Sequence, residues 1–243
     1  MSPTLTAADL RRLRSLRDRK DREAAGLFAI EGEKAVRDLL AENFPFEDIY
    51  ATDAWPGRAT TRITEAQMGR MSHFPTPSCV FAVGRIRREP CPPGALARGL
   101  TLALDRVQDP GNVGTIMRIA DWFALDRVLL SPDCADVYSQ KALQASMASF
   151  ARVRTHVVEL GAALADAPVP VLGCDPAGDK RGLAPVRDAV IVIGSEGRGL
   201  SPAVRERVTR AVAIPRFGGA DSLNAAVAAG IVCAYLRSAN GAS

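Results

Sequence analysis

The chain has 243 residues, of which 47% are hydrophobic and 24% charged, as in a globular protein that buries its core in one large domain or two unequal ones. No apolar run is long enough to cross a bilayer, and the basic N-terminal segment lacks the apolar core of a signal peptide. We therefore expect a cytoplasmic protein with no membrane partner. The net charge of +4 is small but unevenly distributed.

Basic residues cluster between Arg11 and Arg22, where the only acidic residues are Asp18 and Asp21. The candidates for contact with phosphate groups are Arg11, Arg12, Arg14, Arg19, Lys20 and Arg22, with Arg17 among them. Cations clustered in this way displace the counterions of nucleic acids. A solvated helix face has the same pattern, and charge alone does not separate the two interpretations.

The N-terminal part of the chain predicts a small α/β unit followed by a linker. The expected elements are helices over Thr6–Ala25, Glu33–Glu42 and Glu65–Met71 and strands over Leu27–Ile30, Asp48–Thr52 and Cys79–Val83. From Arg85 to Gly99 the sequence is basic and rich in Pro and Gly, which indicates a linker. We place the boundary near residue 95, which gives domains of residues 1–95 and 96–243.

After the linker, strands and helices alternate. The expected strands are Thr101–Val107, Arg127–Leu130, Val153–Val158, Val169–Gly173, Ala189–Ile193 and Ala211–Ile214, and the expected helices are Val113–Ala124, Val137–Phe150, Gly161–Ala165 and Ser222–Leu236. This alternation predicts an α/β fold with a mainly parallel sheet and helices on both faces. Open sheets of this kind build ligand sites at the carboxyl ends of their strands.

Two of the strand-end loops carry clear signals. Gln108–Gly114 opens a helix in which Arg118 lies off the apolar stripe. Asn112 is placed to cap that helix, and Arg118 to form a surface ion pair, so each has a structural alternative to a functional role. The loop Gly194–Gly199 matches neither GxGxxG nor a P-loop, but its glycines allow backbone groups to approach a planar ligand.

The remaining candidates are Glu196 in that loop and Ser222 and Asn224 in a third loop. Glu196 is either an acceptor for N–H groups of its own loop or a functional carboxylate. Ser222 is a natural N-cap, whereas Asn224 has poor helix propensity and no evident packing use. His73 and His156 lie outside all three loops, so the sequence predicts neither a histidine base nor a Ser/His/Asp or Cys/His arrangement.

The cysteines predict no cross-link and no metal. The five are Cys79, Cys91, Cys134, Cys174 and Cys233. Because they are odd in number, widely spaced and never arranged as CxxC, neither a disulfide framework nor a zinc site is favoured. We expect reduced thiols that serve in packing.

Three motifs, taken together in order and spacing, resemble those of a known family. The segments Asp109-Pro-x-Asn112-x-Gly114-x-x-x-Arg118, Gly194-x-Glu196-x-x-Gly199 and Ile214-Pro-x-x-Gly-x-x-x-Ser222-Leu-Asn224 resemble the motifs of the SpoU or TrmH-like RNA 2'-O-ribose methyltransferases of the SPOUT superfamily. The matched region runs from about Leu104 to Leu236. Residues 11–40 also resemble the substrate-binding extension of family members that act on RNA.

The resemblance implies a sheet whose C-terminal segment forms a trefoil knot, an L30e-like N-terminal domain, and S-adenosylmethionine as the methyl donor. The implied donor contacts are Gly194, Gly199, Ile214 and Leu223, and the implied functional side chains are Asn112, Arg118, Glu196, Ser222 and Asn224. Members act as homodimers, in which Arg118 is expected to face the donor of the partner subunit. Arg216, Phe217 and Gln144 depart from the residues common in the family.

The predicted reaction is methyl transfer to a ribose 2'-hydroxyl of RNA, with ribosomal RNA favoured over transfer RNA. Because a guanidinium resists deprotonation, we expect Arg118 to grip the flanking phosphate rather than act as a base. Asn112 and Asn224 would orient the hydroxyl or the donor, and Glu196 would fix its loop. Two alternatives stay open: an RNA-binding protein with a degenerate site, and a methyltransferase that modifies a base nitrogen.

Overall fold

The computed structural model describes residues 5–179 and 183–237, and its contacts divide the chain into two compact units. The first unit comprises the chain up to Arg87 together with Asp136–Ala151, and the second comprises Arg88–Ala135 and the chain from Arg152 onward. A boundary near residue 95 assigns Asp136–Ala151 to the second domain, whereas in the structure this segment packs within the first unit.

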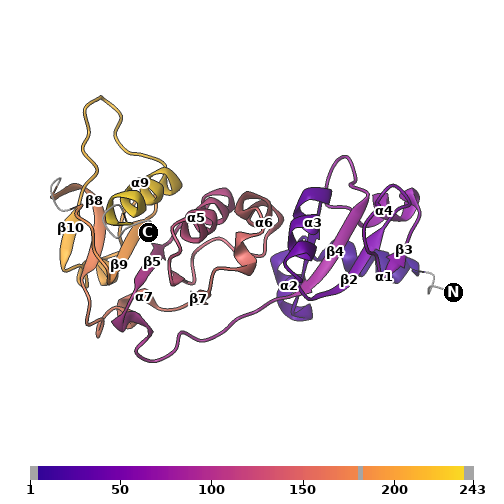
Figure 1. The fold of residues 1–243 in the computed structure, drawn as a ribbon, viewed down its shortest axis with the longest axis horizontal. Coiled ribbons are helices and arrows are strands. Elements are labelled where there is room, and N and C mark those ends of the chain that lie inside the picture. The colour runs from indigo at the N-terminus through magenta and orange to yellow at the C-terminus, as the bar shows by residue number, and fades with distance from the viewer. Residues whose placement is uncertain (1–4, 180–182, 238–243) are drawn as a thin grey trace. The chain divides into compact units, whose positions relative to one another are not determined.

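The first unit is built on a sheet with the strand order β1-β4-β2-β3. Its strands are β1 (Leu27–Glu31), β2 (Phe46–Ala51), β3 (Thr61–Arg62) and β4 (Val80–Arg85), and its helices are α1 (Ala7–Ser15), α2 (Arg19–Ala25), α3 (Glu33–Ala41), α4 (Glu65–Met71) and α6 (Gln140–Ser146). Successive strand side chains point to opposite faces, so Phe28 packs with α3 and α6 while Ala29 packs with α1 and α4 (Figure 1).

A buried ion pair holds the segment Asp136–Ala151 to the first unit. Arg22 donates to Asp136 Oδ2 from Nη2 at 2.7 Å and from Nε at 3.1 Å, and the two side chains are only 3% and 6% exposed. The Arg22 Nη1 atom also donates to the carbonyl oxygens of Leu16 and Arg17 at 2.9 and 2.6 Å. The assignment of Arg22 to an RNA-binding surface is therefore wrong, because its donors are buried and engaged within the protein.

The same contacts accompany a break in the predicted helix over Thr6–Ala25. The helix ends at Ser15, and a second one begins at Arg19 after Asp18, whose backbone is extended. The break releases the carbonyl groups of Leu16 and Arg17, and Arg22 binds them. The partner that completes this arrangement, Asp136, lies 114 residues further along the chain.

The second unit contains a parallel sheet with the strand order β10-β8-β9-β5-β6-β7. Its strands are β5 (Leu100–Asp105), β6 (Arg127–Leu130), β7 (Thr155–Val157), β8 (Val171–Asp179), β9 (Ala189–Gly194) and β10 (Arg210–Val212), and its helices are α5 (Pro110–Trp122), α7 (Leu160–Ala163), α8 (Pro202–Arg205) and α9 (Ala225–Arg237). The prediction of a mainly parallel sheet is confirmed. Among the described residues, no helix has both the length and the apolar character needed to span a membrane.

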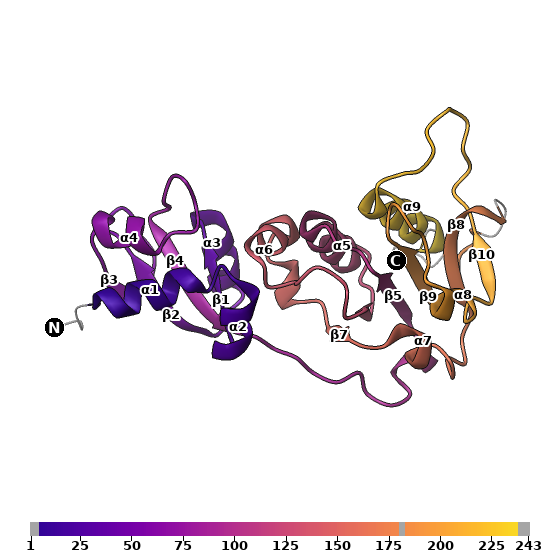
Figure 2. The ribbon, with the colours of Figure 1, turned by 180° about the vertical axis from the view of Figure 1, so that it is seen from behind.

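Helices cover both faces of this sheet. Val190 and Val192 of β9 pack with Leu160 of α7 and Val204 of α8; Figure 2 labels this strand and both helices. Ile193 points to the opposite face, where it lines a cavity together with Val232 of α9. On this second face α9 lies beside α5 (Figure 1).

The strand order reverses between β5 and β9. From β5 the chain passes through α5 to β6 on one side, whereas from β9 it passes through α8 to β10 on the other side. The loops that follow these two neighbouring strands therefore diverge and leave a crevice at the carboxyl edge of the sheet, which is where open α/β sheets bind ligands. The predicted motifs at Asn112 and Glu196 both lie at this edge.

The buried pair gives a stability prediction. Arg22→Ala leaves the Asp136 carboxylate buried without its cation, so we expect the free energy of unfolding of the first unit to fall by about 3–5 kcal/mol. Arg19→Ala in the same helix removes a side chain that is 53% exposed. This substitution should change the free energy of unfolding by less than about 0.5 kcal/mol.

Urea denaturation followed by tryptophan fluorescence measures this difference. Trp55 in the first unit is 2% exposed, whereas Trp122 in the second is 82% exposed, so the signal reports chiefly on the first unit. Equal denaturation midpoints for the two variants would contradict a structural role for Arg22.

Candidate functional site

The loop after β9 carries a carboxylate that hydrogen-bonds to both other motif segments. Glu196 Oε1 accepts from Asn112 Nδ2 at 2.7 Å, from Asn224 Nδ2 at 3.0 Å and from the backbone N of Ala225 at 3.3 Å. Asn224 Nδ2 also donates to Asn112 Oδ1 at 2.9 Å. Asn112, Glu196 and Asn224, separated by up to 112 residues in sequence, thus form one cluster.

The helix caps differ from those that the sequence predicts. Asn224 caps α9, because its Oδ1 accepts from the backbone N of Ala226 at 2.9 Å and of Val227 at 3.2 Å. The prediction that Ser222 is the cap is wrong, since α9 begins only at Ala225. Asn112 does not cap α5 either, because the Asp109 side chain accepts from the Asn112 backbone N at 3.0 Å. The Asn112 side chain is therefore left to bind Glu196.

A tight turn holds Glu196 in place. Ser195 and Gly199 exchange backbone hydrogen bonds of 3.2 and 2.9 Å across this turn. A Cβ atom on Gly194 would lie 2.4 Å from the Gly199 carbonyl carbon, and Gly199 itself has a φ of +61°. Both positions therefore require glycine, one for close backbone approach and one for its left-handed conformation.

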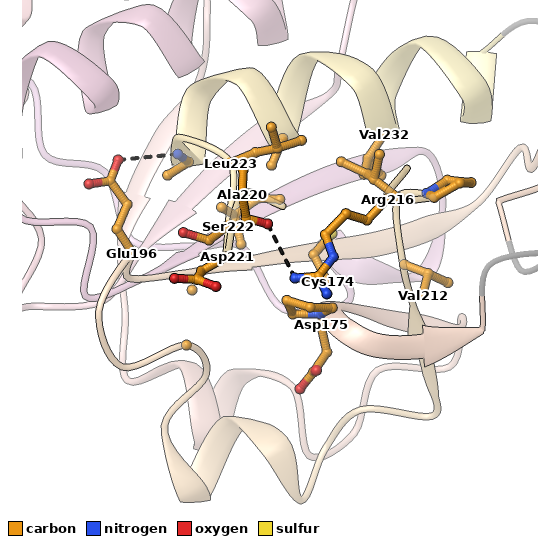
Figure 3. A pocket seen from close by; sticks show the side chains of 18 of the residues that line it. Cys174, Asp175, Glu196, Val212, Arg216, Ala220, Asp221, Ser222, Leu223 and Val232 are labelled. Atoms are coloured by element: carbon orange, nitrogen blue, oxygen red, sulfur yellow. Dashed lines mark hydrogen bonds between the residues drawn. The ribbon is translucent and has the colours of Figure 1, made fainter. Parts of the chain in front are cut away.

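A cavity of about 560 Å³ lies between this turn, the ends of β8 and β10, and the start of α9. Figure 3 shows Glu196 at one end of the cavity and Val212 and Val232 at the other. All four predicted donor contacts line it, namely Gly194, Gly199, Ile214 and Leu223, as does Ser222. A volume of this size is typical of sites for small molecules and cofactors.

One polar residue of the cavity, Asp175, was not among the candidates of the sequence analysis, whereas Arg216 was named there as a departure from the family. Asp175 lies at the end of the predicted strand Val169–Gly173, and its Oδ2 pairs with Arg205 Nη1 at 3.0 Å. Arg216 also lines the cavity, where its Nη1 donates to the carbonyl oxygen of Ala220 at 3.2 Å (Figure 3). Because Cys174 and Asp175 come directly after the predicted strand, a search of the residues that follow each predicted strand would have found them, although the structure places both inside β8.

The Cys174 thiol is a neutral part of the wall. Burial, with a smaller contribution from Cys233, raises the pKa of Cys174 to about 12. The thiol therefore stays protonated at neutral pH and does not act as a nucleophile there.

Arg118 stands apart from the cluster in its own chain. It is exposed on α5 and does not line the 560 Å³ cavity. It also does not line a smaller cavity of about 260 Å³ that shares Ser195, Glu196 and Ala225 with the first. Six residues separate it from Asn112, which corresponds to roughly 9 Å along the helix axis. Its expected position opposite the donor of a partner subunit stays a prediction.

The fold and the site define a class: an α/β protein with a cofactor-sized cavity at the switch point of a parallel sheet. The model of the SpoU rRNA Methylase family matches residues 99–234, and that of the MRM3-like substrate binding domain matches residues 8–82. Over 236 residues the chain is 29% identical to the 23S rRNA (guanosine(2553)-2'-O)-methyltransferase RlmP of Bacillus subtilis, with 92% of this chain and 94% of that protein covered.

Solved structures agree with this assignment. A TrmH-family protein from Porphyromonas gingivalis is 38% identical with a TM-score of 0.85, covering 97% of this chain and 99% of that one. An AdoMet-bound rRNA methyltransferase from Sinorhizobium meliloti is 26% identical with a TM-score of 0.85, covering 98% and 97%. The chain belongs to the SpoU rRNA methylase family, and it is an RNA methyltransferase that uses S-adenosylmethionine.

The residues of the cavity fit this donor. Ile193, Ile214 and Val232 would supply apolar walls for an adenosine group, and the glycine turn would let backbone groups approach it. The carboxylates of Asp175 and Asp221 complement the cationic amino and sulfonium groups of the donor. The Ser195 Oγ atom is buried without a hydrogen-bond partner in the described structure, which leaves a polar group for a ligand.

The glycine turn provides a matched pair of variants. Gly194→Ala places a Cβ atom 2.4 Å from the backbone of Gly199 and forces the turn to move, so we expect S-adenosylmethionine affinity to fall by at least about tenfold. In Gly197→Ala the new Cβ meets nothing within 4 Å, so affinity should stay within about twofold. Isothermal titration with the donor measures both, and equal losses would show that backbone approach at Gly194 does not shape the site.

Proposed function

We propose that this enzyme transfers the methyl group of S-adenosylmethionine to a ribose 2'-hydroxyl of ribosomal RNA. The observation that carries the proposal is the Asn112–Glu196–Asn224 cluster, which adjoins the donor cavity and joins all three motif segments. The relative RlmP is named as a 2'-O-methyltransferase of 23S rRNA, which supports both the ribose and the RNA class. An intact cluster argues against a degenerate site that only binds RNA.

The side chains of the cluster position the reacting groups and do not take part in the reaction themselves. When bound, the donor supplies a methyl group on a cationic sulfur. Glu196 Oε1 accepts three N–H groups and so holds the turn to both helices. Asn112 and Asn224 are thereby fixed beside the cavity. Both N–H groups of Asn224 are engaged within the cluster, whereas the Asn112 amide retains a second N–H to orient the target hydroxyl or the donor carboxylate.

The role that we propose for Arg118 is to grip the phosphate beside the target ribose. A guanidinium keeps its proton in proteins, so it anchors the strand and holds the hydroxyl in line instead of removing the proton itself. The proton then leaves through the bound phosphate or a water molecule. Because Arg118 lies away from the cavity of its own chain, we assign it to the cavity of a second copy.

The exposed face of α5 and α9 supports a homodimer. Trp122 lies one turn from Arg118 on α5 and is 82% exposed, and Val227 and Tyr235 on α9 are 50% and 49% exposed. These helices lie side by side, and each carries large apolar side chains that are exposed. Surfaces of this kind are typical of self-association.

Three further features of the family belong to the proposal. A C-terminal trefoil knot agrees with the hydrogen bond from the Val186 backbone N to the Leu236 carbonyl at 3.2 Å, which joins the end of α9 to the segment before β9. An L30e-like first unit agrees with the MRM3-like match. Its proposed RNA contacts are Arg11, Arg12, Arg14, Arg19 and Lys20, all exposed on or beside α1 and α2. A ribosomal RNA substrate places the enzyme in the cytoplasm.

Methylation assays test the reaction. Unmodified 23S rRNA and total tRNA are incubated with the protein and methyl-labelled donor, and nucleosides from the digested RNA are separated by mass spectrometry. We expect label on ribose, and in the 23S rRNA rather than the tRNA. Label on a base nitrogen, or donor binding without transfer to either RNA, would refute the proposed reaction.

Arg118→Ala should abolish methyl transfer, by at least about a hundredfold, because a misplaced hydroxyl reacts far more slowly. The donor dissociation constant should stay nearly unchanged, since Arg118 does not line the cavity of its own chain. Arg154→Ala serves as the control, because Arg154 is an exposed arginine of the second unit that lines neither cavity. Lost donor binding with normal turnover per bound donor would contradict the assigned role.

Mixed dimers test whether Arg118 acts in the partner's site. Arg118→Ala and Glu196→Ala chains carrying different tags are co-expressed, and the mixed species is purified. One of its two sites then combines an intact cluster with an intact arginine, so about half of the wild-type activity per dimer should return. A mixed dimer as inactive as its parents would place Arg118 in the site of its own chain.

A further inference from the structure

Arg106, directly after β5, has a left-handed backbone with a φ of +59°. Among the described residues, the other non-glycine positions with positive φ are Asn43, Ala124, Met147 and Ala148. Those four follow the ends of α3, α5 and α6, where a left-handed residue is an ordinary way to end a helix. Arg106 instead follows a strand at the carboxyl edge of the sheet, and strained backbone at such an edge often serves a function.

The Arg106 side chain is only partly engaged by the protein. Its Nε lies 3.5 Å from Asp105 Oδ1, and its Nη2 donates to the carbonyl oxygen of Gly199 over 3.4 Å. The Nε atom is buried and makes no hydrogen bond within the described structure. A guanidinium has five N–H donors, so most of those on Arg106 remain for a ligand.

The free donors of Arg106 adjoin a second cavity, of about 260 Å³. Ser195, Glu196 and Ala225 line both this cavity and the donor cavity, so they form the wall between the two. Arg198 is exposed on the same turn and also lines the second cavity. The two carboxylates that line the same pocket, Asp109 and Glu196, already accept N–H groups of the protein. The two guanidinium groups are therefore suited to an oxyanion, above all a phosphate, which arginine binds with paired N–H groups.

We propose that Arg106, assisted by Arg198, binds a phosphodiester of the RNA strand next to the methylated nucleotide. This inference rests on the proposed function and deepens it, because the methyl acceptor must lie across the wall from the donor. It adds a phosphate contact from the same subunit as the donor cavity, in addition to the one assigned to the partner's Arg118. The carbonyl of Gly199 and the carboxylate of Asp105 hold the guanidinium in place before RNA arrives.

Substitution at Arg106 separates this role from a structural one. Arg106→Gln removes the charge, and Arg106→Gly in addition relieves the backbone strain, since glycine adopts a positive φ freely. We expect both variants to bind RNA at least about tenfold more weakly at low salt. Arg106→Gly should melt at or above the wild-type temperature, and Arg154→Gln is the control with the same loss of charge.

The decisive measurement is the salt dependence of binding to an unmodified 23S rRNA transcript. Losing one phosphate contact should lower the slope of log affinity against log salt by about 0.7 in both Arg106 variants and leave it unchanged in Arg154→Gln. This slope is measured below the melting temperature of every variant, so a change in stability does not alter it. S-adenosylmethionine affinity, from calorimetry, should match the wild type.

Two results would overturn the inference. A wild-type slope in both Arg106 variants would show that the residue only balances the charge of Asp105. Weakened donor binding with an unchanged slope would assign the guanidinium to the donor carboxylate instead. Methyl transfer by the wild-type protein is assayed on the same transcript, so absence of transfer refutes the proposed reaction while the slopes still decide the role of Arg106.

Discussion

One carboxylate oxygen connects the three segments that make the site. Glu196 Oε1 receives N–H groups from α5, from the residue that caps α9 and from the first residue of α9. Each of these hydrogen bonds gives a partner to an N–H group at a helix start or beside the cavity. The shape of the 560 Å³ cavity therefore depends on Glu196, since its hydrogen bonds join the turn that lines the cavity to both helices.

The strand order explains why the hydrogen bonds of Glu196 lie at this edge of the sheet. The chain leaves β5 and β9 in opposite directions, so their loops part and leave room at the carboxyl edge. Gly194 and Gly199 then let the turn close tightly on itself, and both residues line the cavity. Along the rim, Arg216 lines the cavity and Phe217 is 98% exposed.

The local sequence pattern predicted the helices and strands well, but it did not predict contacts between residues that are far apart in the sequence. The parallel sheet follows from apolar runs such as Ala189–Ile193 between glycine loops, and the cluster of Asn112, Glu196 and Asn224 lies in loops that the same runs delimit. The burial of Arg22 was not predictable, because its partner Asp136 is remote in sequence and charge clustering says nothing of pairing. The caps were misassigned because several candidates stand within three residues of each helix start.

The mechanism that we propose uses arginines and needs no histidine. His156 is buried with its Nδ1 atom against the carbonyl oxygen of Glu89, and His73 belongs to the first unit, so neither adjoins the cavity. Arginines have a fixed charge and hold phosphates without exchanging protons. In the function that we propose, the rate would come from alignment of the hydroxyl by arginines that hold the neighbouring phosphates, so the position of each arginine would matter most.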